Sequence, residues 1–212
     1  MIAPPPYYSQ CGQDQLIDEL LGHKRNGVFV DVGAADGEIN SNTLFFEESR
    51  DWHGILIEPH PAAAEACHAR RSSPVVECAI LSRSDNYLTE FRAIAGEYSQ
   101  MSYAIDRADR LNIDRIAKYA EKSPLEESII MVQVCPLQAL LDKFSLHHID
   151  YLSIDTEGAD LDVLQTIDWT RTTATVISTE KQANSIPIDC FLASIGYKLI
   201  HDLGWENIWH KS

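Results

Sequence analysis

A repeated alternation of short apolar strands with helices is the feature that most restricts the fold of this chain. Three runs rich in apolar residues, Val28–Val32, Gly54–Ile57 and Val75–Leu81, are typical of buried strands. The two segments between them, Ser41–Arg50 and Pro61–Arg71, are predicted to be helical, the first with a serine suited to capping it. The order strand, helix, strand, helix, strand predicts an α/β fold with a parallel sheet covered by helices.

The same rhythm returns after a less regular middle. Further helices are predicted over Asp14–Leu21, Asp106–Glu121, Leu137–Phe144, Ala159–Ile167 and Ile188–Ile195. Further strands are predicted over Ile129–Val134, Tyr151–Ile154, Thr175–Ile177, Tyr197–Ile200 and Asn207–Trp209, and a hairpin over Tyr87–Ile94 and Tyr98–Tyr103. We expect a single domain over residues 1–212, with an N-terminal arm of residues 1–13 that contains a proline run. We also expect an antiparallel strand pair at the C-terminal edge of the sheet.

The charge of the chain restricts the classes of molecule that it is expected to bind. Lys and Arg number 17 against 32 Asp and Glu, so the 212-residue chain has a formal net charge of −15. Such a surface repels phosphate backbones and anionic lipid, and we expect no nucleic-acid partner. The longest uncharged apolar run, residues 128–141, is shorter than the roughly 20 residues of a membrane span. The N-terminus lacks the pattern of a secretory signal, and the five cysteines form no C-x-x-C pair, which favours a reducing, cytoplasmic setting.

Two strand ends carry residues suited to binding a ligand. In an open parallel sheet, ligands bind at the carboxyl ends of the strands, near the point where the strand order reverses. The first strand runs into the small-residue turn Asp31–Gly37, which lets backbone approach a ligand closely, and Glu58 follows the second and suits the hydroxyls of a ribose. The turn has neither the G-x-G-x-x-G spacing of a dinucleotide site nor the lysine of a P-loop. The alternative is a tight turn beside a surface glutamate.

A second acidic group follows the later strands. Asp155, Glu157 and Glu180 come at the ends of two strands that are expected to reach the same edge of the sheet. These carboxylates suit the binding of a cation, the binding of an amine or the removal of a proton. The alternatives are a solvated acidic rim and a cap for the next helix. No pair among the eight histidines has the spacing of a helical zinc site.

Four sequence blocks extend over most of the chain. They are Y-S-Q-C-G-Q-D at Tyr8–Asp14, F-V-D-V-G-A-A-D-G-E-I-N-S-N-T at Phe29–Thr43, W-H-G-I-L-I-E-P-H-P at Trp52–Pro61, and I-D-Y-L-S-I-D-T-E-G-A-D-L-D-V-L at Ile149–Leu164. In this order they resemble the FkbM-type methyltransferases, which use S-adenosylmethionine. The resemblance implies a Rossmann-like class I methyltransferase fold, with a seven-stranded, mostly parallel sheet, an antiparallel C-terminal edge and helices on both faces.

The resemblance also implies roles for individual residues. The turn after the first strand matches the loop beside the methionine part of the cofactor, Glu58 matches the ribose ligand, and two residues of the third strand match the segment near adenine. The residues implied to bind the cofactor are Gln10, Gln13, Asp31, Gly33, Ala34, Ala35, Asp36, Gly37, Asn42, Glu58, Pro59, Cys78, Ala79, Asp155 and Thr156. Asp155 and Glu157, beside the transferable methyl, are implied to be catalytic. Residues 86–127 align with no motif and are expected to form an insertion on the acceptor side.

The expected reaction is transfer of a methyl group from S-adenosylmethionine to a hydroxyl of a sugar, a glycan or a small natural product. An in-line transfer mainly requires two reactants to be held in position. The hydroxyl must also lose a proton, for which Asp155 or a nearby histidine is the expected base and a carboxylate-bound Mg²⁺ is the alternative aid. Two other functions stay open. One is an NAD-type oxidoreductase, which Glu58 favours and the absent glycine pattern disfavours, and the other is a non-catalytic binding protein of the same fold.

Overall fold

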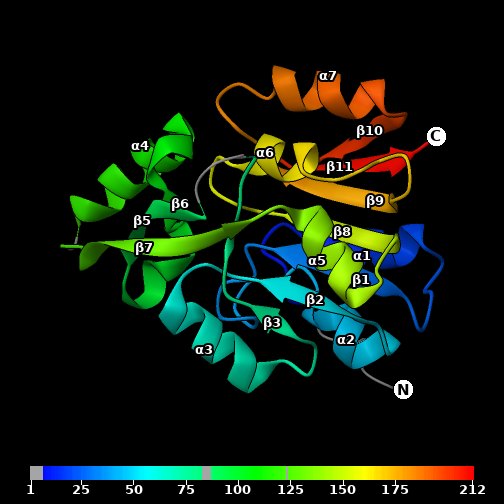
Figure 1. The fold of residues 1–212 in the computed structure, drawn as a ribbon, viewed down its shortest axis with the longest axis horizontal. Helices are drawn as coiled ribbons and strands as arrows, with labels where there is room; N and C mark the ends of the chain where they lie inside the picture. Colours follow the sequence, from blue (N-terminus) through cyan, green and yellow to red (C-terminus); the bar gives the residue numbers. More distant parts are fainter. Residues whose placement is uncertain (1–6, 83–86, 123) are drawn as a thin grey trace.

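The structure is a computed structural model that describes residues 7–82, 87–122 and 124–212. Within these residues the larger sheet has seven strands in the order β10-β11-β9-β8-β1-β2-β3 (Figure 1). They are β1 (Val28–Val32), β2 (His53–Ile57), β3 (Val75–Val76), β8 (His148–Ile154), β9 (Thr173–Glu180), β10 (Tyr197–Asp202) and β11 (Glu206–Lys211). Neighbouring strands are parallel except at β11, which is antiparallel to both β9 and β10. The predicted mostly parallel sheet with an antiparallel strand pair at its C-terminal edge is confirmed, with β10 as the edge strand and β11 next to it.

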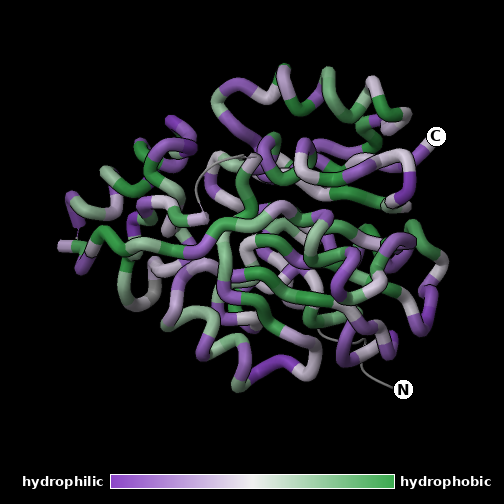
Figure 2. Tube along the Cα trace, viewed as in Figure 1, coloured by the Kyte–Doolittle hydropathy of each residue, from purple (hydrophilic) through white to green (hydrophobic). Residues whose placement is uncertain are grey.

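Different helices cover the two faces of this sheet, because successive side chains of a strand point to opposite sides. The helices are α5 (Leu137–Phe144), α6 (Asp160–Gln165) and α7 (Ile186–Ser194) on one face, and α1 (Gln13–Leu20), α2 (Leu44–Arg50) and α3 (Pro61–Arg70) on the other. Val30 and Val32 of β1 belong to the first core and Phe29 to the second, all 2% exposed or less. Figure 2 shows the hydrophobic strands inside and hydrophilic residues gathered on the outer turns.

A smaller sheet lies beside the main one, with strand order β4-β7-β5-β6 (Figure 1). It consists of β4 (Ala79–Ile80), β5 (Leu88–Ile94), β6 (Tyr103–Ala104) and β7 (Glu127–Cys135). The segments between these strands include the 3₁₀ helices η1 (Gly96–Met101) and η2 (Ile105–Arg107) and the helix α4 (Arg110–Ala120). The prediction of one strand over Val75–Leu81 is therefore wrong. Its first part pairs with β2, and after a turn at Glu77-Cys78 its second part pairs with β7 in the smaller sheet.

Two other predicted boundaries shift for local reasons. The predicted hairpin after Tyr87 is confirmed only as β5 and the two-residue β6, because η1 takes up most of its second arm. The helix predicted from Ser41 begins at Leu44, with Thr43 as its N-cap. The Ser41 hydroxyl oxygen accepts the backbone N–H of Leu44 at 3.2 Å, so this serine closes the turn before the helix.

The chain from Tyr7 onward lies against α2. The ring centroids of Tyr7 and Phe45 are 4.4 Å apart, and the backbone N–H groups of Tyr8 and Ser9 donate to the carboxylate of Asp14. The rest of the predicted arm, residues 1–6, lies outside the described residues. Within the described ranges, no helix combines the length and the apolar character that crossing a membrane requires.

Candidate active site

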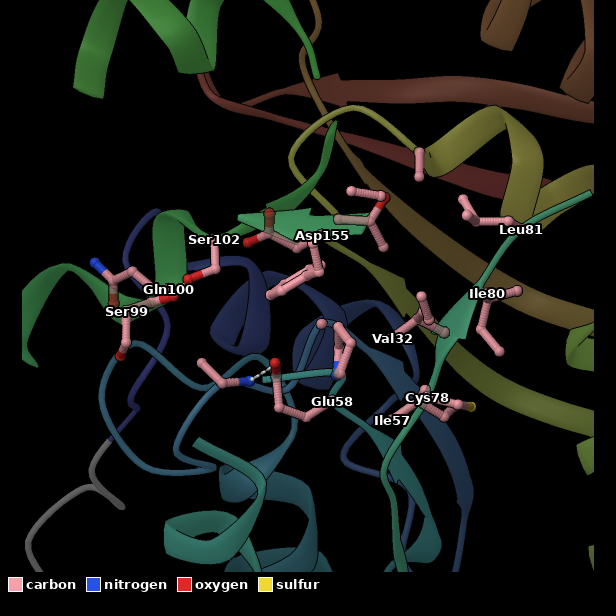
Figure 3. Close-up of a pocket in the computed structure, with 18 residues that line it drawn as sticks. Val32, Ile57, Glu58, Cys78, Ile80, Leu81, Ser99, Gln100, Ser102 and Asp155 are labelled. Atoms are coloured by element: carbon pink, nitrogen blue, oxygen red, sulfur yellow. Dashed lines mark hydrogen bonds between the residues drawn. The ribbon is translucent and has the colours of Figure 1, made fainter. Parts of the chain in front are cut away.

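A first cavity opens at the carboxyl ends of β1, β2 and β8, where the main sheet meets the smaller one (Figure 3). The space between its lining atoms is about 540 Å³, part of it open to solvent. One wall is largely apolar and comes from β4, β5 and β6, and the other is the turn after β1. The residues implied by the sequence to bind a cofactor that line this cavity are Gly33, Ala35, Glu58, Pro59, Cys78, Ala79, Asp155 and Thr156.

Glu58 supplies a buried carboxylate to the first cavity at the end of β2. It is 6% exposed, and one of its oxygens accepts the backbone N–H of Ala35 at 2.8 Å (Figure 3). The other oxygen accepts the backbone N–H of His60 at 2.7 Å. Burial raises the pKa of Glu58 to about 7, against the two backbone hydrogen bonds, which lower it. Each carboxylate oxygen keeps a further lone pair, so Glu58 can accept hydrogen bonds from a pair of ligand hydroxyls.

Gly33 allows the ends of β1 and β8 to meet. Its φ is +92°, and a Cβ placed on it would lie 1.8 Å from the carbonyl oxygen of Asp155. The space that glycine leaves at this position is therefore filled by protein backbone, while the Gly33 backbone itself lines the cavity.

The end of the same turn lies away from the cavities. Gly37 has a φ of +75°, and a Cβ there would meet the Cys67 sulfur at 2.7 Å and the Arg71 side chain at 2.8 Å. The Asp36 carboxylate accepts the backbone N–H groups of Glu38 and Ile39. Neither Asp36 nor Gly37 lines the first cavity or its neighbour, so both act here on the turn and its packing.

A chain of buried polar side chains fixes the floor of a second cavity. Asp31 accepts the hydroxyl of Thr43 at 2.6 Å, and burial raises the pKa of this carboxylate. The Gln13 amide donates to the Asn42 oxygen at 2.7 Å, and the Asn42 amide donates to the Ser153 hydroxyl at 3.0 Å. The predicted residues that line only this cavity are Gln10, Gln13, Asp31, Ala34, Asn42 and Glu157.

The second cavity adjoins the first and is more polar. It encloses about 1170 Å³, again partly open to solvent, and the two share four lining residues: Gly33, Ala35, Gln100 and Asp155. Residues from η1, α4 and the loop before β11 form much of its outer wall, and the sequence patterns singled out none of these residues individually. They are Tyr98, Gln100, Met101, Arg115, Tyr119 and Trp205, joined by Glu206 of β11. No histidine of the described residues lines either cavity, so the alternative of a histidine base has no candidate among them.

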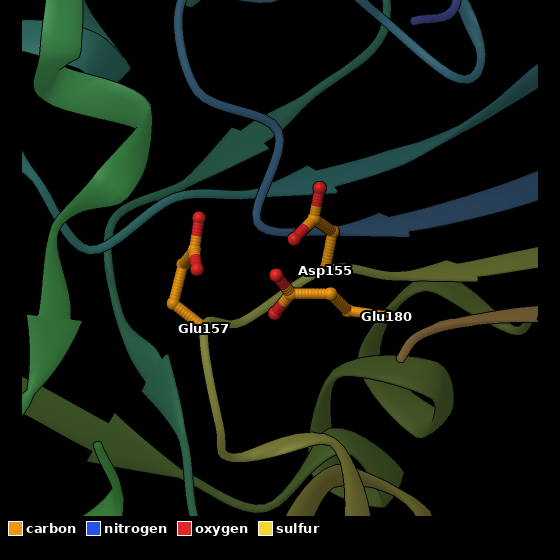
Figure 4. Close-up of side chains that lie close together, drawn as sticks. All are labelled: Asp155, Glu157 and Glu180. Carbon is orange, nitrogen blue, oxygen red and sulfur yellow. The ribbon is translucent and has the colours of Figure 1, made fainter. Parts of the chain in front are cut away.

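The predicted acidic group comes together beside the shared wall (Figure 4). One carboxylate oxygen each from Asp155, Glu157 and Glu180 lies within 4.8 Å of the other two. Burial raises the pKa of Asp155 to about 6 and that of Glu157 to about 8. The guanidinium of Arg115 on α4 donates to Glu157 and, at 3.4 Å, to Glu180, which favours the charged forms of these carboxylates.

Asp160 holds the ends of β8 and β9 together. Its carboxylate accepts the hydroxyl and the backbone N–H of Thr156 at 2.6 and 3.2 Å, and the backbone N–H of Glu180 at 2.9 Å. The N-cap of α6 is Ala159, without a side-chain cap. No described residue donates a hydrogen bond to the carboxylate of Asp155, so the alternative that Asp155 caps the helix α6 is wrong. Asp155 instead lines both cavities.

Comparison with known proteins identifies the family. No curated protein matches the chain. It is similar to a solved TehB-like SAM-dependent methyltransferase from Corynebacterium glutamicum, with a TM-score of 0.47 and 11% identity over 98% of this chain and 89% of that one. It is also similar to a proposed RNA methyltransferase from Pyrococcus horikoshii, with a TM-score of 0.46 and 10% identity over 95% and 82%. The family model of the methyltransferase FkbM domain matches residues 31–201, which is most of the chain. The chain therefore belongs to the FkbM methyltransferase family.

Proposed function

We propose that the protein transfers a methyl group from S-adenosylmethionine to a hydroxyl of a sugar, a glycan or a small natural product. The observation that carries the proposal is the pair of adjoining cavities that share the wall at Asp155. Two ligands held on either side of one wall residue have their reactive ends close together, which is the main requirement of an in-line transfer. Membership of a methyltransferase family supplies the reaction class.

The first cavity fits the adenosyl part of the cofactor. Its apolar wall, which includes Ile80, Leu81 and Phe91, suits a flat base, and Glu58 suits the ribose hydroxyls. The acidic residues toward the second cavity, Asp31 and Asp155, suit the positive charge of a sulfonium. When bound, the cofactor supplies an electrophilic methyl group.

The second cavity fits a hydroxylated acceptor. Carboxylates and amides line it together with the rings of Tyr98, Tyr119 and Trp205, a mixture that serves hydroxyl groups and the apolar faces of sugar rings. We assign Asp155 as the base that takes the hydroxyl proton at its carboxylate. With a pKa of about 6 it is ionised at neutral pH, whereas Glu157, with a pKa of about 8, retains a proton there.

Calorimetry with S-adenosylhomocysteine tests the cofactor assignment. Glu58→Ala removes the hydrogen bonds to the ribose and is expected to weaken binding by about 1.5–3 kcal/mol, which is roughly tenfold to a hundredfold. Glu65→Ala, an exposed glutamate on the neighbouring helix α3, is the matched control and is expected to bind as the parent does. Unchanged affinity in Glu58→Ala would remove the assignment, and saturable binding of NAD in place of S-adenosylhomocysteine would favour the oxidoreductase instead.

A further inference from the structure

The second cavity gathers more carboxyl groups than its one basic side chain can pair with. Among the described residues that line it, five carry carboxylates: Asp31, Asp155, Glu157, Glu180 and Glu206. Arg115 is the one basic side chain in that lining. Its guanidinium binds only two of the five acids, Glu157 and Glu180, so the cavity keeps an excess of acidic groups around a shared space.

Two of these acids are buried with an oxygen that has no partner. Glu180 and Glu206 lie opposite each other in the pairing of β9 with β11, so their side chains point to the same face of the sheet. They are 8% and 5% exposed, and the Oε2 atom of each is buried without a hydrogen-bond partner in the part of the chain that the structure describes. Because a buried polar atom without a partner is costly, these two oxygens indicate a ligand that the protein groups themselves do not supply.

The spacing of the carboxylates matches the coordination sphere of a divalent cation. The oxygens of Asp155, Glu157 and Glu180 lie within 4.8 Å of one another (Figure 4). With metal–oxygen distances of about 2.3–2.6 Å for Ca²⁺ and about 2.0–2.1 Å for Mg²⁺, ligands on opposite sides of one ion are about 4–5 Å apart. All the donors are carboxylate oxygens, which hard divalent cations prefer over nitrogen or sulfur.

We infer that Asp155, Glu157 and Glu180 form a binding site for one divalent cation, with Glu206 opposite Glu180 in the neighbouring strand, and that Arg115 is the internal counter-ion that limits its affinity. Arg115 stands in contact with two of the ligands and lies 5.9 Å from the centre of the Trp205 ring. A cation at this place would adjoin the wall shared by the two cavities, where it would orient the acceptor hydroxyl and lower the pKa of that hydroxyl. This use of the cation rests on the proposed function, but the binding itself does not.

Isothermal titration of the metal-free full chain with Mg²⁺, Ca²⁺ and Mn²⁺ tests the site. We expect one site per chain. Glu157→Gln and Glu180→Gln keep the side-chain shape but remove a ligand charge, and each is expected to weaken binding about tenfold or more. Arg115→Gln removes the competing charge and is expected to tighten binding about tenfold. The matched controls, Asp114→Asn and Arg110→Gln, lie on the exposed side of the same helix and are expected to leave the affinity unchanged.

Each other outcome overturns the inference. The absence of saturable binding to a chain with a native circular dichroism spectrum excludes the site. Binding that Glu157→Gln and Glu180→Gln leave intact places the cation elsewhere, and weaker binding in Arg115→Gln excludes the counter-ion role. Titration of the same samples with S-adenosylhomocysteine separates the two proposals: cofactor binding without a cation contradicts only the metal site, and cation binding without cofactor contradicts only the methyltransferase proposal.

Discussion

Glu58 is a carboxylate whose charge depends on the cavity around it. Removal from water raises its pKa from 4.5 to about 7, although two backbone N–H groups donate to it. Glu58 therefore gains or loses its proton near neutral pH, where an exposed glutamate is fully ionised. A hydroxyl ligand donates its hydrogen bonds to the ionised form, so binding of the ligand and release of this proton are linked.

We therefore expect S-adenosylhomocysteine to bind more tightly as the pH rises from about 6 to about 8. Below its pKa of about 7 the protonated Glu58 must first lose its proton, which costs up to about tenfold in affinity per pH unit. Glu58→Gln is expected to bind S-adenosylhomocysteine weakly and with an affinity that no longer depends on the titration of residue 58. Any pH dependence that comes from the ligand's own groups is the same in both proteins. Calorimetry across the pH range measures the difference, and an identical slope in Glu58→Gln would contradict the role of this carboxylate.

The raised pKa of Glu58 also makes the stability of the fold depend on pH, but stability falls as the pH rises, whereas ligand binding tightens. Because the folded-state pKa of Glu58 lies above its unfolded value, the folded chain binds more protons, and this residue lowers stability as pH rises from about 4.5 to about 7. Glu58→Gln is therefore expected to melt at a higher temperature than the parent at about pH 8, by a few degrees. A scan at about pH 4 serves as the reference, where both proteins carry a neutral side chain.

Asp155 is expected to matter for the rate far more than for cofactor binding. Asp155→Asn retains the size of the side chain but cannot accept the proton of a hydroxyl, so single-turnover methylation of an acceptor is expected to slow by about 10²–10⁴-fold. The affinity for S-adenosylhomocysteine is expected to change by much less. Parent-like turnover in this variant would show that the base is another group.

Among the structural elements, β1 and β8 are held together at their ends by one close contact between the backbones of Gly33 and Asp155. Gly33 and Gly204 have the same φ of +92°, but a Cβ on Gly33 would meet the backbone of Asp155 whereas one on Gly204 would meet nothing within 4 Å. Gly204→Ala is expected to cost only the backbone strain, about 1 kcal/mol. Gly33→Ala adds a clash that neither strand can relieve, and we expect a loss of about 3 kcal/mol or more in urea unfolding. Equal losses in the two variants would mean that β1 and β8 can move apart.

The elements that depend on local sequence were predicted well. The run Val28–Val32 is β1 without a shift, and Leu137–Phe144 is α5, because apolar spacing and flanking residues define both. The division of the third predicted strand was missed, since the partner of its second half is β7, far along the chain. Arg115 and Glu206 were missed for the same reason. Nothing near them in the sequence signals a site, and they reach it only through the packing of α4 and the placement of β11 beside β9.

The whole molecule carries a formal charge of −15, and five carboxyl groups and one arginine line the second cavity. Long-range attraction from such a field favours a cationic ligand over a neutral one of the same shape. S-adenosylmethionine and S-adenosylhomocysteine form such a pair, because the sulfonium of the first carries one charge that the thioether of the second lacks.

We expect salt to weaken the binding of S-adenosylmethionine more than that of S-adenosylhomocysteine. Between about 0.01 M and about 1 M ionic strength the Debye length falls from about 30 Å to about 3 Å, which removes long-range attraction and leaves contacts in place. Parallel calorimetric titrations of both compounds measure the ratio of their affinities. A ratio that does not change with salt would mean that the field of the protein contributes nothing to cofactor choice.

The outer wall of the second cavity has a consequence for how the protein can diversify. Apart from Trp205 and Glu206, that wall comes from the stretch between Tyr98 and Tyr119. The same stretch contributes Ser99, Gln100, Ser102 and Ala104 to the first cavity, so exchanging all of it would alter both cavities together. Paralogues that share a donor and differ in what they modify are therefore expected to vary at Tyr98, Met101 and Tyr119, which line the second cavity alone.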